Sequence, residues 1–219
     1  MNRLIQTSDG SHSLISEQFQ VSYHSIHGAI EESKVVFIDA GLAFKKQDKS
    51  KLKVLEIGFG TGLNAIMTYQ FALSKQLAIE YTTFEAFPID LETARQLNYP
   101  DLLKFEHCSE ILLKFHSHSN VDLDLFKFHK YIQDFHQIDF RNEFDVIFFD
   151  AFAPSAQPTL WEAEMMQKMY DSLLPGGVLT TYCAQGAFKR TLKSIGFCIE
   201  ALPGPKGKRE ITRAMKQSV

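Results

Sequence analysis

Residues 54–64 contain the feature that most limits how this chain can fold. They read Val-Leu-Glu-Ile-Gly-Phe-Gly-Thr-Gly-Leu-Asn, so an apolar strand runs into three alternate glycines and then into a helix. Glycine permits a tight turn and lets a ligand approach the backbone closely, while the start of a helix offers unpaired N–H donors. A glycine-rich turn can be purely structural, but three glycines within five residues favour a ligand-binding loop.

Strand and helix patterns alternate after this loop. We expect strands at 54–57, 79–85, 123–129, 144–149, 178–182 and 197–202, and helices at 63–74, 89–97, 101–115, 159–174 and 187–194. Residues 210–215 are expected to close an edge of the sheet. This alternation predicts an α/β fold with a doubly wound, mostly parallel sheet, in which ligands bind at the carboxyl ends of the strands.

The first part of the chain follows a different pattern. Residues 4–23 show short β-type runs around Asp9-Gly10, a dipeptide that favours hairpin turns, and residues 28–44 have a helical pattern. We therefore predict an N-terminal extension over residues 1–45, followed by the main domain over residues 46–219.

Composition sets the general class of protein. A length of 219 residues with 45% hydrophobic residues suits one ordinary domain with a sizeable core. No apolar run approaches the roughly 18–20 residues of a membrane helix, and the N-terminus turns polar too early for a secretory signal. Three scattered cysteines fit neither a disulfide framework nor a zinc site, so we expect a cytoplasmic protein without a metal.

The charge is distributed unevenly along the chain. The formal net charge of −3 argues by itself against a nucleic-acid binder. Residues 186–219, however, contain eight Lys and Arg against two Glu, a local charge of +6, which leaves −9 for residues 1–185. This asymmetry predicts a local contact with nucleic acid and not an enveloping basic surface.

The loop also narrows the choice of ligand. A dinucleotide-binding loop needs a third glycine at the position of Leu63, and no Lys-Ser or Lys-Thr pair follows as in a phosphate-binding P-loop. The acid-x-Gly-x-Gly-x-Gly pattern that begins at Glu56 resembles the cofactor loop of S-adenosylmethionine-dependent methyltransferases. Glu85, at the end of the next strand, can bind a ribose diol, which supports a nucleoside ligand of either kind.

Asp150 is the candidate catalytic residue. It follows the apolar strand 144–149 and begins the segment Asp-Ala-Phe-Ala-Pro, so it is expected beside the cofactor. Methyl transfer to an amine needs a neutral nucleophile, and a carboxylate can orient the ammonium form and accept its proton. An Asp that merely caps the following turn is the structural alternative.

Four motifs together resemble one family, the methyltransferase domain of the MnmC proteins, whose stand-alone form is called MnmD. The motifs are Gly58–Asn64, Phe84–Pro88, Asp150–Pro154 with Pro158 and Trp161, and Gly204–Glu210. The resemblance covers nearly the whole chain and includes the segment Gly28–Ser33. One departure is that the Gly-Asp pair common in the family after the third strand is missing here, and Asp134 is the residue expected to supply the adenine contact.

The resemblance implies a Rossmann-like methyltransferase that uses S-adenosyl-L-methionine to N-methylate 5-aminomethyl-(2-thio)uridine at the tRNA wobble position. It implies that Asp150 is catalytic and that the anticodon loop of tRNA is the partner, and we expect no FAD oxidase activity. The expected cofactor residues are Glu56, Gly58, Phe59, Gly60, Thr61, Gly62, Asn64, Glu85, Ala86 and Asp134. The expected substrate and tRNA residues are Tyr23, Phe152, Pro154, Trp161, Lys206, Lys208 and Arg209.

Three other functions remain open at this point. The chain could methylate another amine on a protein or small molecule, act as a nucleotide-dependent oxidoreductase, or bind RNA without catalysis. The sequence does not reveal the tRNA isoacceptors, the need for 2-thiolation, the source of the aminomethyl precursor or the oligomeric state.

Overall fold

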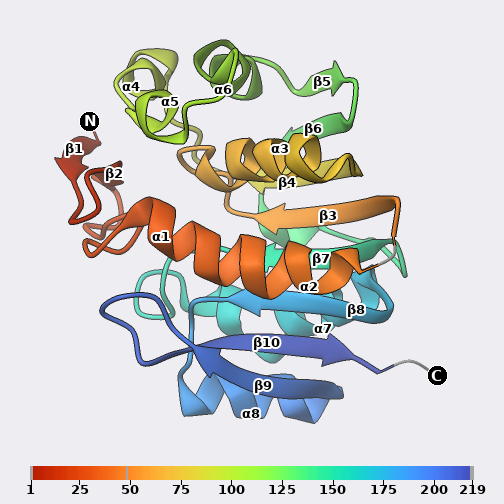
Figure 1. The fold of residues 1–219 in the computed structure, drawn as a ribbon. Coiled ribbons are helices and arrows are strands. Elements are labelled where there is room, and N and C mark those ends of the chain that lie inside the picture. The colour runs from red at the N-terminus through yellow and green to blue at the C-terminus, as the bar shows by residue number, and fades with distance from the viewer. Residues whose placement is uncertain (1, 48, 218–219) are drawn as a thin grey trace.

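A computed structural model describes residues 2–47 and 49–217, and within them the strands form a two-stranded hairpin and an eight-stranded sheet (Figure 1). The hairpin pairs β1 (Arg3–Gln6) with β2 (His12–Ile15) across the predicted Asp9-Gly10 turn. The strands of the main sheet are β3 (Lys51–Ile57), β4 (Ala78–Glu85), β5 (Asn120–Leu123), β6 (Phe126–Ile132), β7 (Phe144–Phe149), β8 (Leu173–Thr181), β9 (Phe197–Pro203) and β10 (Glu210–Lys216).

The main sheet has the strand order β5-β6-β4-β3-β7-β8-β10-β9. The five neighbouring strands β6, β4, β3, β7 and β8 run parallel to one another. At the two sides of the sheet, β5 pairs antiparallel with β6, and β10 pairs antiparallel with both β8 and β9. The chain therefore winds outward from β3 in both directions. This arrangement confirms the predicted doubly wound, mostly parallel sheet.

Helices cover both faces of the sheet, and each face has its own apolar core. The helices are α1 (Ala29–Ser33), the π-type η1 (Lys34–Ala43), α2 (Phe44–Lys46), α3 (Leu63–Lys75), α4 (Leu91–Arg95), α5 (Tyr99–Leu103), α6 (Cys108–Ser117), the 3-10 turns η2 (Phe135–Gln137) and η3 (Pro158–Trp161), α7 (Ala163–Ser172) and α8 (Gly186–Ile195). The segments α1, η1 and α2 run on as one helix in front of the sheet, as predicted for residues 28–44 (Figure 1).

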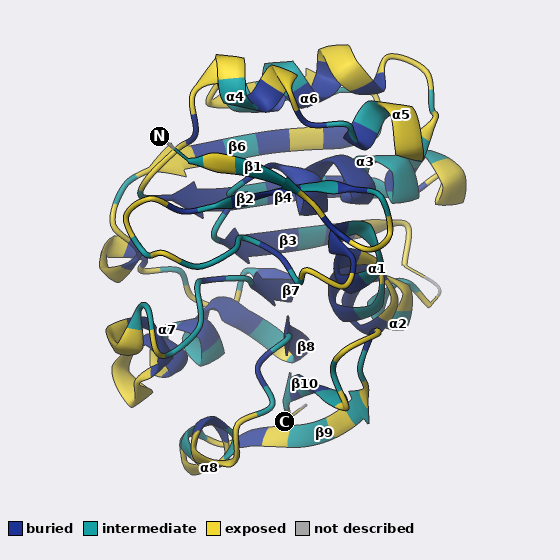
Figure 2. Ribbon diagram, turned by 90° about the vertical axis from the view of Figure 1, so that its left-hand side faces the viewer, coloured by how far each residue is buried: buried dark blue, intermediate teal, exposed yellow. Residues whose placement is uncertain are grey.

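Residue alternation in β7 shows how the two cores arise. Val146 and Phe148 pack with η1, α3 and α6, whereas Ile147 and Phe149 pack with α7 and α8. Because both faces are covered, every residue of β7 is buried, and Figure 2 shows the same dark core along the central strands. This agrees with the continuous apolar run at 144–149.

Four local predictions were wrong. The strand expected at 123–129 is a hairpin, because residues 124–125 form a turn between β5 and β6. The helix expected at 101–115 is two helices, because the backbone at Lys104 and His107 turns to positive φ. The helix expected at 159–174 ends at Ser172, because Leu173 is already extended and pairs with Phe144. Residues 210–216 form an interior strand between β8 and β9, and β9 lies at the edge instead.

The division of the chain into an extension over residues 1–45 and a main domain over residues 46–219 stays a prediction. Residue 1 of the extension and residues 48, 218 and 219 of the main domain lie outside the described residues. The helix of the first segment packs directly on the main sheet, where Phe37 lies 5.1 Å from Phe148 between ring centroids. Among the described helices, none is long and apolar enough to cross a membrane.

Candidate functional site

The carboxyl ends of β4, β3 and β7 meet at one edge of the sheet. Ile57 at the end of β3 pairs with Phe84 on one side and Phe149 on the other, so the residues that follow these strands are neighbours. A pocket lies between them, lined by Gly58, Phe59, Gly60, Thr61, Leu63, Asn64, Glu85, Asp150, Tyr23, His24, Phe87, Phe135, Ala151, Phe152 and Gln157. The structure thus brings together the predicted glycine loop, Glu85 and Asp150.

Gly58 makes the sharp turn at the end of β3. Its φ of +94° lies in the left-handed region, and a Cβ there would lie 2.7 Å from the backbone oxygen of Asp150. The N–H groups of Gly58 and Phe59 both donate to the carbonyl oxygen of Phe84, at 3.0 and 3.2 Å. Only glycine therefore lets the loop pass this close to the end of β7.

Glu85 ties the glycine loop to the end of β4. Its carboxylate accepts hydrogen bonds from the N–H of Gly60 and the N–H of Phe87, both at 2.7 Å. Burial raises the pKa of Glu85, and these two N–H groups partly offset that effect. Because a carboxylate has about four acceptor positions, Glu85 keeps the capacity to bind ribose hydroxyls while it holds the loop.

Asp150 faces the pocket from the end of β7. Its Oδ2 accepts a hydrogen bond of 2.8 Å from the side-chain amide of Asn64, in the first turn of α3. Burial, followed by the nearby charges of Glu32 and Glu56, raises the pKa of Asp150 well above its ordinary value. A carboxylate with a raised pKa is a stronger base, which suits it to accept a proton at the site.

Glu56 lies beneath the glycine loop and is not among the residues that line the pocket. The side chain is fully buried, and its Oε2 accepts a 2.7 Å hydrogen bond from the hydroxyl of Thr83 on β4. Burial raises the pKa of Glu56 to about 7. The geometry gives Glu56 a supporting position under the loop, and its contact with the cofactor stays a prediction.

Aromatic side chains from the N-terminal segment cover the pocket. The ring of Tyr23 lies 4.9 Å from that of Phe152, and the ring of Phe19 lies 4.9 Å from Phe152 and 5.6 Å from Phe87. The sequence predicts Tyr23 and Phe152 on the substrate side, and both lie in the pocket wall. Phe19 was not predicted, because a single Phe in a polar loop gives no signal.

The segment after Asp150 is held by side-chain hydrogen bonds. Trp161 is buried, and its indole N–H donates to the carbonyl oxygen of Phe152 at 2.8 Å, while the side-chain oxygen of Gln157 accepts from the N–H of Phe152 at 3.0 Å. Trp161 therefore anchors the segment from inside. Pro154 lines a second hollow, together with Ala153, Tyr182, Cys183, Ala184, Gln185, Lys208, Arg209 and Glu210.

Asp134 and Ala86 do not line the pocket, although each is next to a residue that does. The exposed Asp134 caps η2, and its carboxylate accepts hydrogen bonds from the backbone and ring nitrogens of His136, at 2.8 and 2.7 Å. The next residue, Phe135, lines the pocket and was not predicted. Adenine contacts from Asp134 or Ala86 stay predictions.

Thr61 links the glycine loop to the N-terminal segment. Its hydroxyl accepts a 3.0 Å hydrogen bond from Tyr99 and lies 3.5 Å from Nε2 of His24. Burial lowers the pKa of His24 to about 4, so its ring is neutral at pH 7. These contacts fix the wall of the pocket between the loop and residues 23–24.

Comparisons with known proteins show the family to which the chain belongs. A profile of a family described as S-adenosyl-L-methionine-dependent methyltransferase matches residues 92–217, more than half of the chain. The chain belongs to this methyltransferase family. S-adenosylmethionine is therefore the cofactor of this methyltransferase, as the pattern of the glycine loop predicts.

Two curated relatives support this conclusion. The relatives are the "tRNA 5-methylaminomethyl-2-thiouridine biosynthesis bifunctional protein MnmC" of Actinobacillus pleuropneumoniae serotype 5b, 27% identical, and that of Idiomarina loihiensis, 29% identical. Each alignment covers 90% of this chain but 32% or 36% of the relative, so the methyltransferase spans about a third of their length. This similarity confirms the resemblance to the MnmC methyltransferase domain.

The structural matches show the fold. MnmC2 from Aquifex aeolicus superposes with a TM-score of 0.82 at 21% identity, over 100% of this chain and 72% of that one. Spermidine synthase from Thermotoga maritima gives a TM-score of 0.60 at 21% identity, over 99% of this chain and 74% of that one.

The pocket of the methyltransferase fits S-adenosylmethionine. The glycine loop lines the pocket with its backbone, and Glu85 offers acceptor oxygens for the ribose. The first turn of α3 begins at Leu63 and presents N–H donors suited to the carboxylate of the amino-acid tail. When bound, the cofactor supplies an electrophilic methyl group on a sulfonium.

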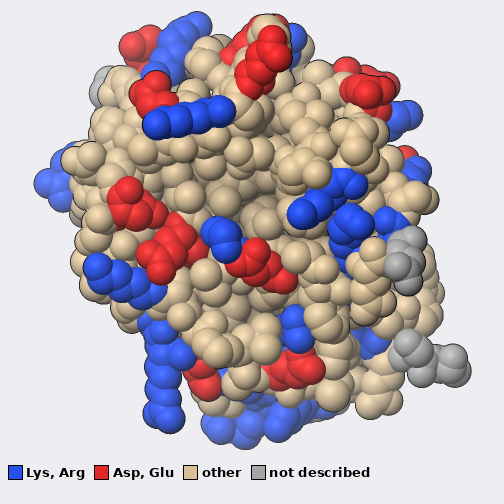
Figure 3. Space-filling view, in the orientation of Figure 1, with Lys and Arg blue, Asp and Glu red and all other residues tan. Residues whose placement is uncertain are grey.

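The basic residues of the β9–β10 loop have different surroundings. Lys206 and Arg209 are exposed, whereas Lys208 is partly buried and forms an ion pair with Glu32. Acidic and basic side chains are interspersed on the face drawn in Figure 3, and no broad basic surface covers it. This distribution suits a local contact with RNA, which stays a prediction.

Proposed function

We propose that this methyltransferase transfers a methyl group to the amine of 5-aminomethyl-(2-thio)uridine at the tRNA wobble position, giving the 5-methylaminomethyl product. The observation that carries the proposal is the alignment of 90% of the chain with curated proteins named for 5-methylaminomethyl-2-thiouridine biosynthesis in tRNA. The basic loop at Lys206 and Arg209 supports an RNA substrate, and we place the reaction in the cytoplasm.

The side chain of Asp150 supports an amine as the acceptor. An aminomethyl group is an ammonium ion near pH 7 and has no lone pair for attack, so a proton must leave first. The pKa of Asp150 is raised by burial and nearby carboxylates, which brings it closer to that of an ammonium ion. Asp150 accepts one proton from the ammonium and leaves a neutral nitrogen, which forms the new C–N bond as the C–S bond breaks.

The covered pocket supports the transfer step. Tyr23 and Phe152 line the pocket together with Asp150, and the amide of Asn64 fixes the carboxylate by its 2.8 Å hydrogen bond. Alignment and exclusion of water are the main requirements of an in-line displacement.

Nucleoside mass spectrometry tests the proposal directly. Purified protein and S-adenosylmethionine should convert tRNA that carries 5-aminomethyl-2-thiouridine to its 5-methylaminomethyl form, and tRNA from cells without the protein should accumulate the aminomethyl nucleoside. Unchanged tRNA in both experiments would refute the proposal.

A second candidate is methylation of an amine on a protein or a small molecule. The same Asp150 chemistry would serve such a substrate, but the basic loop favours RNA. Because phosphate contacts weaken as salt rises, a tRNA affinity that does not depend on salt would favour the second candidate. The family match favours methyl transfer over the oxidoreductase alternative.

A further inference from the structure

A buried carboxylate and an aromatic ring enclose the ammonium group of Lys208. Its Nζ lies 2.5 Å from Oε1 of Glu32 and 4.0 Å from the centre of the Tyr182 ring. The side chain of Glu32 is 7% exposed, and its other oxygen accepts a 2.7 Å hydrogen bond from the N–H of Ser25. A carboxylate beside an aromatic face is a set of groups that binds alkylammonium ions well.

This ammonium cage, formed by Glu32 and Tyr182, lies close enough to Asp150 that, besides burial, the charge of Glu32 raises the pKa of the Asp150 carboxyl group. It opens into a hollow that shares Tyr23, His24 and Phe152 with the cofactor pocket. The hydroxyl of Tyr182 donates to the carbonyl oxygen of Ala151, the residue next to Asp150, at 2.8 Å. The Tyr182 side of the cage is therefore fastened to the segment that carries Asp150.

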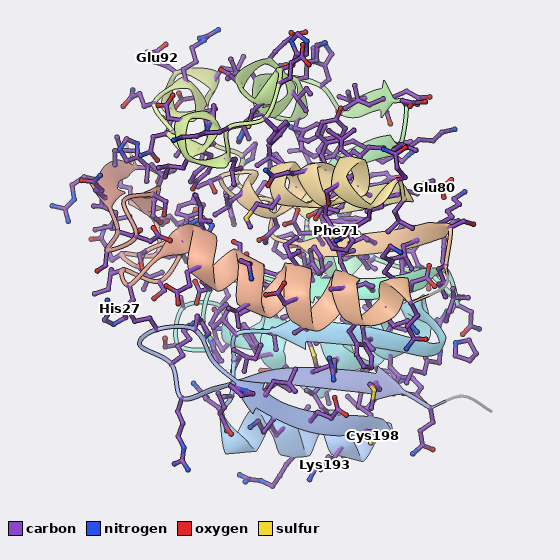
Figure 4. All side chains as sticks on the ribbon, in the orientation of Figure 1. His27, Phe71, Glu80, Glu92, Lys193 and Cys198 are labelled. Carbon is purple, nitrogen blue, oxygen red and sulfur yellow. The ribbon has the colours of Figure 1, made fainter. Side chains whose placement is uncertain are left out.

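Lys208 reaches the cage from the β9–β10 loop, which rests on the start of α1 (Figure 1). Gly207 lies so close to His27 that a Cβ would come within 2.0 Å of its ring, and Figure 4 shows His27 beside this loop. The backbone of Lys206 contacts Glu31 at 3.4 Å. Because the loop is held by its backbone and Lys208 remains 28% exposed, the long side chain can leave the cage without moving the loop.

We propose that the Glu32–Tyr182 cage recognises the ammonium group of the methyl acceptor, and that Lys208 occupies the cage until the acceptor amine displaces it. This inference rests on the proposed function, because it requires an acceptor with a primary amine. The exchange replaces one cation by another, so the buried carboxylate of Glu32 always has a cationic partner. A buried carboxylate without such a partner would destabilise the folded protein. The displaced Lys208 side chain turns to the solvent beside Arg209.

Two RNA probes separate the ammonium contribution from the phosphate contribution. They are tRNA anticodon stem-loops that differ only at the wobble position, one with 5-aminomethyluridine and one with uridine. Their dissociation constants are measured with the full chain in the presence of S-adenosylhomocysteine, which prevents turnover. The ratio used below is the dissociation constant of the uridine RNA divided by that of the aminomethyl RNA. It reports recognition of the amine, because the phosphate contacts of the two RNAs are the same and cancel.

Four variants test the cage. K208M removes the competing cation and should tighten binding of the aminomethyl RNA relative to uridine RNA, so the ratio rises. E32Q should reduce the ratio by about tenfold or more. The double variant E32Q/K208M leaves no unpaired buried charge, so it keeps the test valid if E32Q folds poorly. K206M, the matched lysine in the same loop, should weaken both RNAs equally and leave the ratio unchanged.

The outcomes distinguish this inference from the proposed function. The cage would be overturned if E32Q/K208M kept the wild-type ratio or if the ratio fell in K208M. The proposed function would still hold in that case, provided that the wild type methylates the aminomethyl RNA. Absence of methylation by the wild type would overturn both. Melting temperature and cofactor affinity, measured for each variant, establish that the pocket is intact.

Discussion

Replacing Glu56 by glutamine tests the ionisation of the carboxyl group beneath the glycine loop. Burial raises its pKa from 4.5 to about 7 in the folded protein. Between these values the folded chain holds a proton that the unfolded chain has lost, so the wild-type free energy of unfolding falls as pH rises and levels off above pH 7. One pKa unit corresponds to about 1.4 kcal/mol. The raised pKa of Glu56 therefore lowers the free energy of unfolding by about 3 kcal/mol between acid and neutral pH.

Urea unfolding of the wild type and E56Q, from about pH 4.5 to about pH 8.5, measures this effect. The free energy of unfolding of E56Q relative to wild type should rise by about 3 kcal/mol across the range. E80Q on the same sheet is a control of opposite sign, because hydrogen bonding and pairing with Lys51 lower the pKa of Glu80. E80Q should be the less stable protein at pH 7, with the deficit disappearing in acid. A difference between E56Q and wild type that does not change with pH would refute the reasoning.

Three further predictions concern the pocket and the loop. D150N should lower kcat by about 10²–10⁴-fold while S-adenosylmethionine affinity, measured by calorimetry, stays within about threefold; an equal loss of both would make Asp150 a cofactor ligand. G58A should lower the free energy of unfolding, measured in urea, by about 2–4 kcal/mol, because of backbone strain and the clash at 2.7 Å. G10A is the control, because Gly10 has a similar φ of +86° but open space around it, and it should cost only about 1 kcal/mol. Equal losses in the two variants would contradict the clash. R209M should reduce the slope of log tRNA affinity against log salt by about one and leave cofactor affinity unchanged, and an unaltered slope would exclude a phosphate contact.

Local patterns in the sequence were enough to predict the sheet and the centre of the site. The alternation of strands and helices gave the layers, and the glycines at 58, 60 and 62 gave the loop, because a tight turn requires them. Glu85 and Asp150 could be placed in one pocket because Glu85 ends one strand, Asp150 follows another, and the carboxyl ends of these strands lie at the same edge of the sheet.

Contacts between distant segments could not be predicted in this way. Lys208 and Glu32 are 176 positions apart, and nothing near either residue indicates that they pair. The interior position of β10 depends on its pairing with both β8 and β9, which a pattern within 210–215 does not reveal. Glu56 is part of a loop motif, but its burial under the loop follows from the direction of one side chain in β3.

The position of β10 also sets an order of assembly during synthesis. β9 leaves the ribosome first, yet it joins the sheet only through β10, which pairs with β8 on its other side. Until residues 210–216 emerge, β8 presents an open edge of unpaired N–H and C=O groups that can recruit other chains. The strands that carry the glycine loop, Glu85 and Asp150 are complete much earlier, so a nascent chain gains its cofactor pocket before it closes its sheet. Translation that stalls near residue 200 would therefore release an aggregation-prone chain.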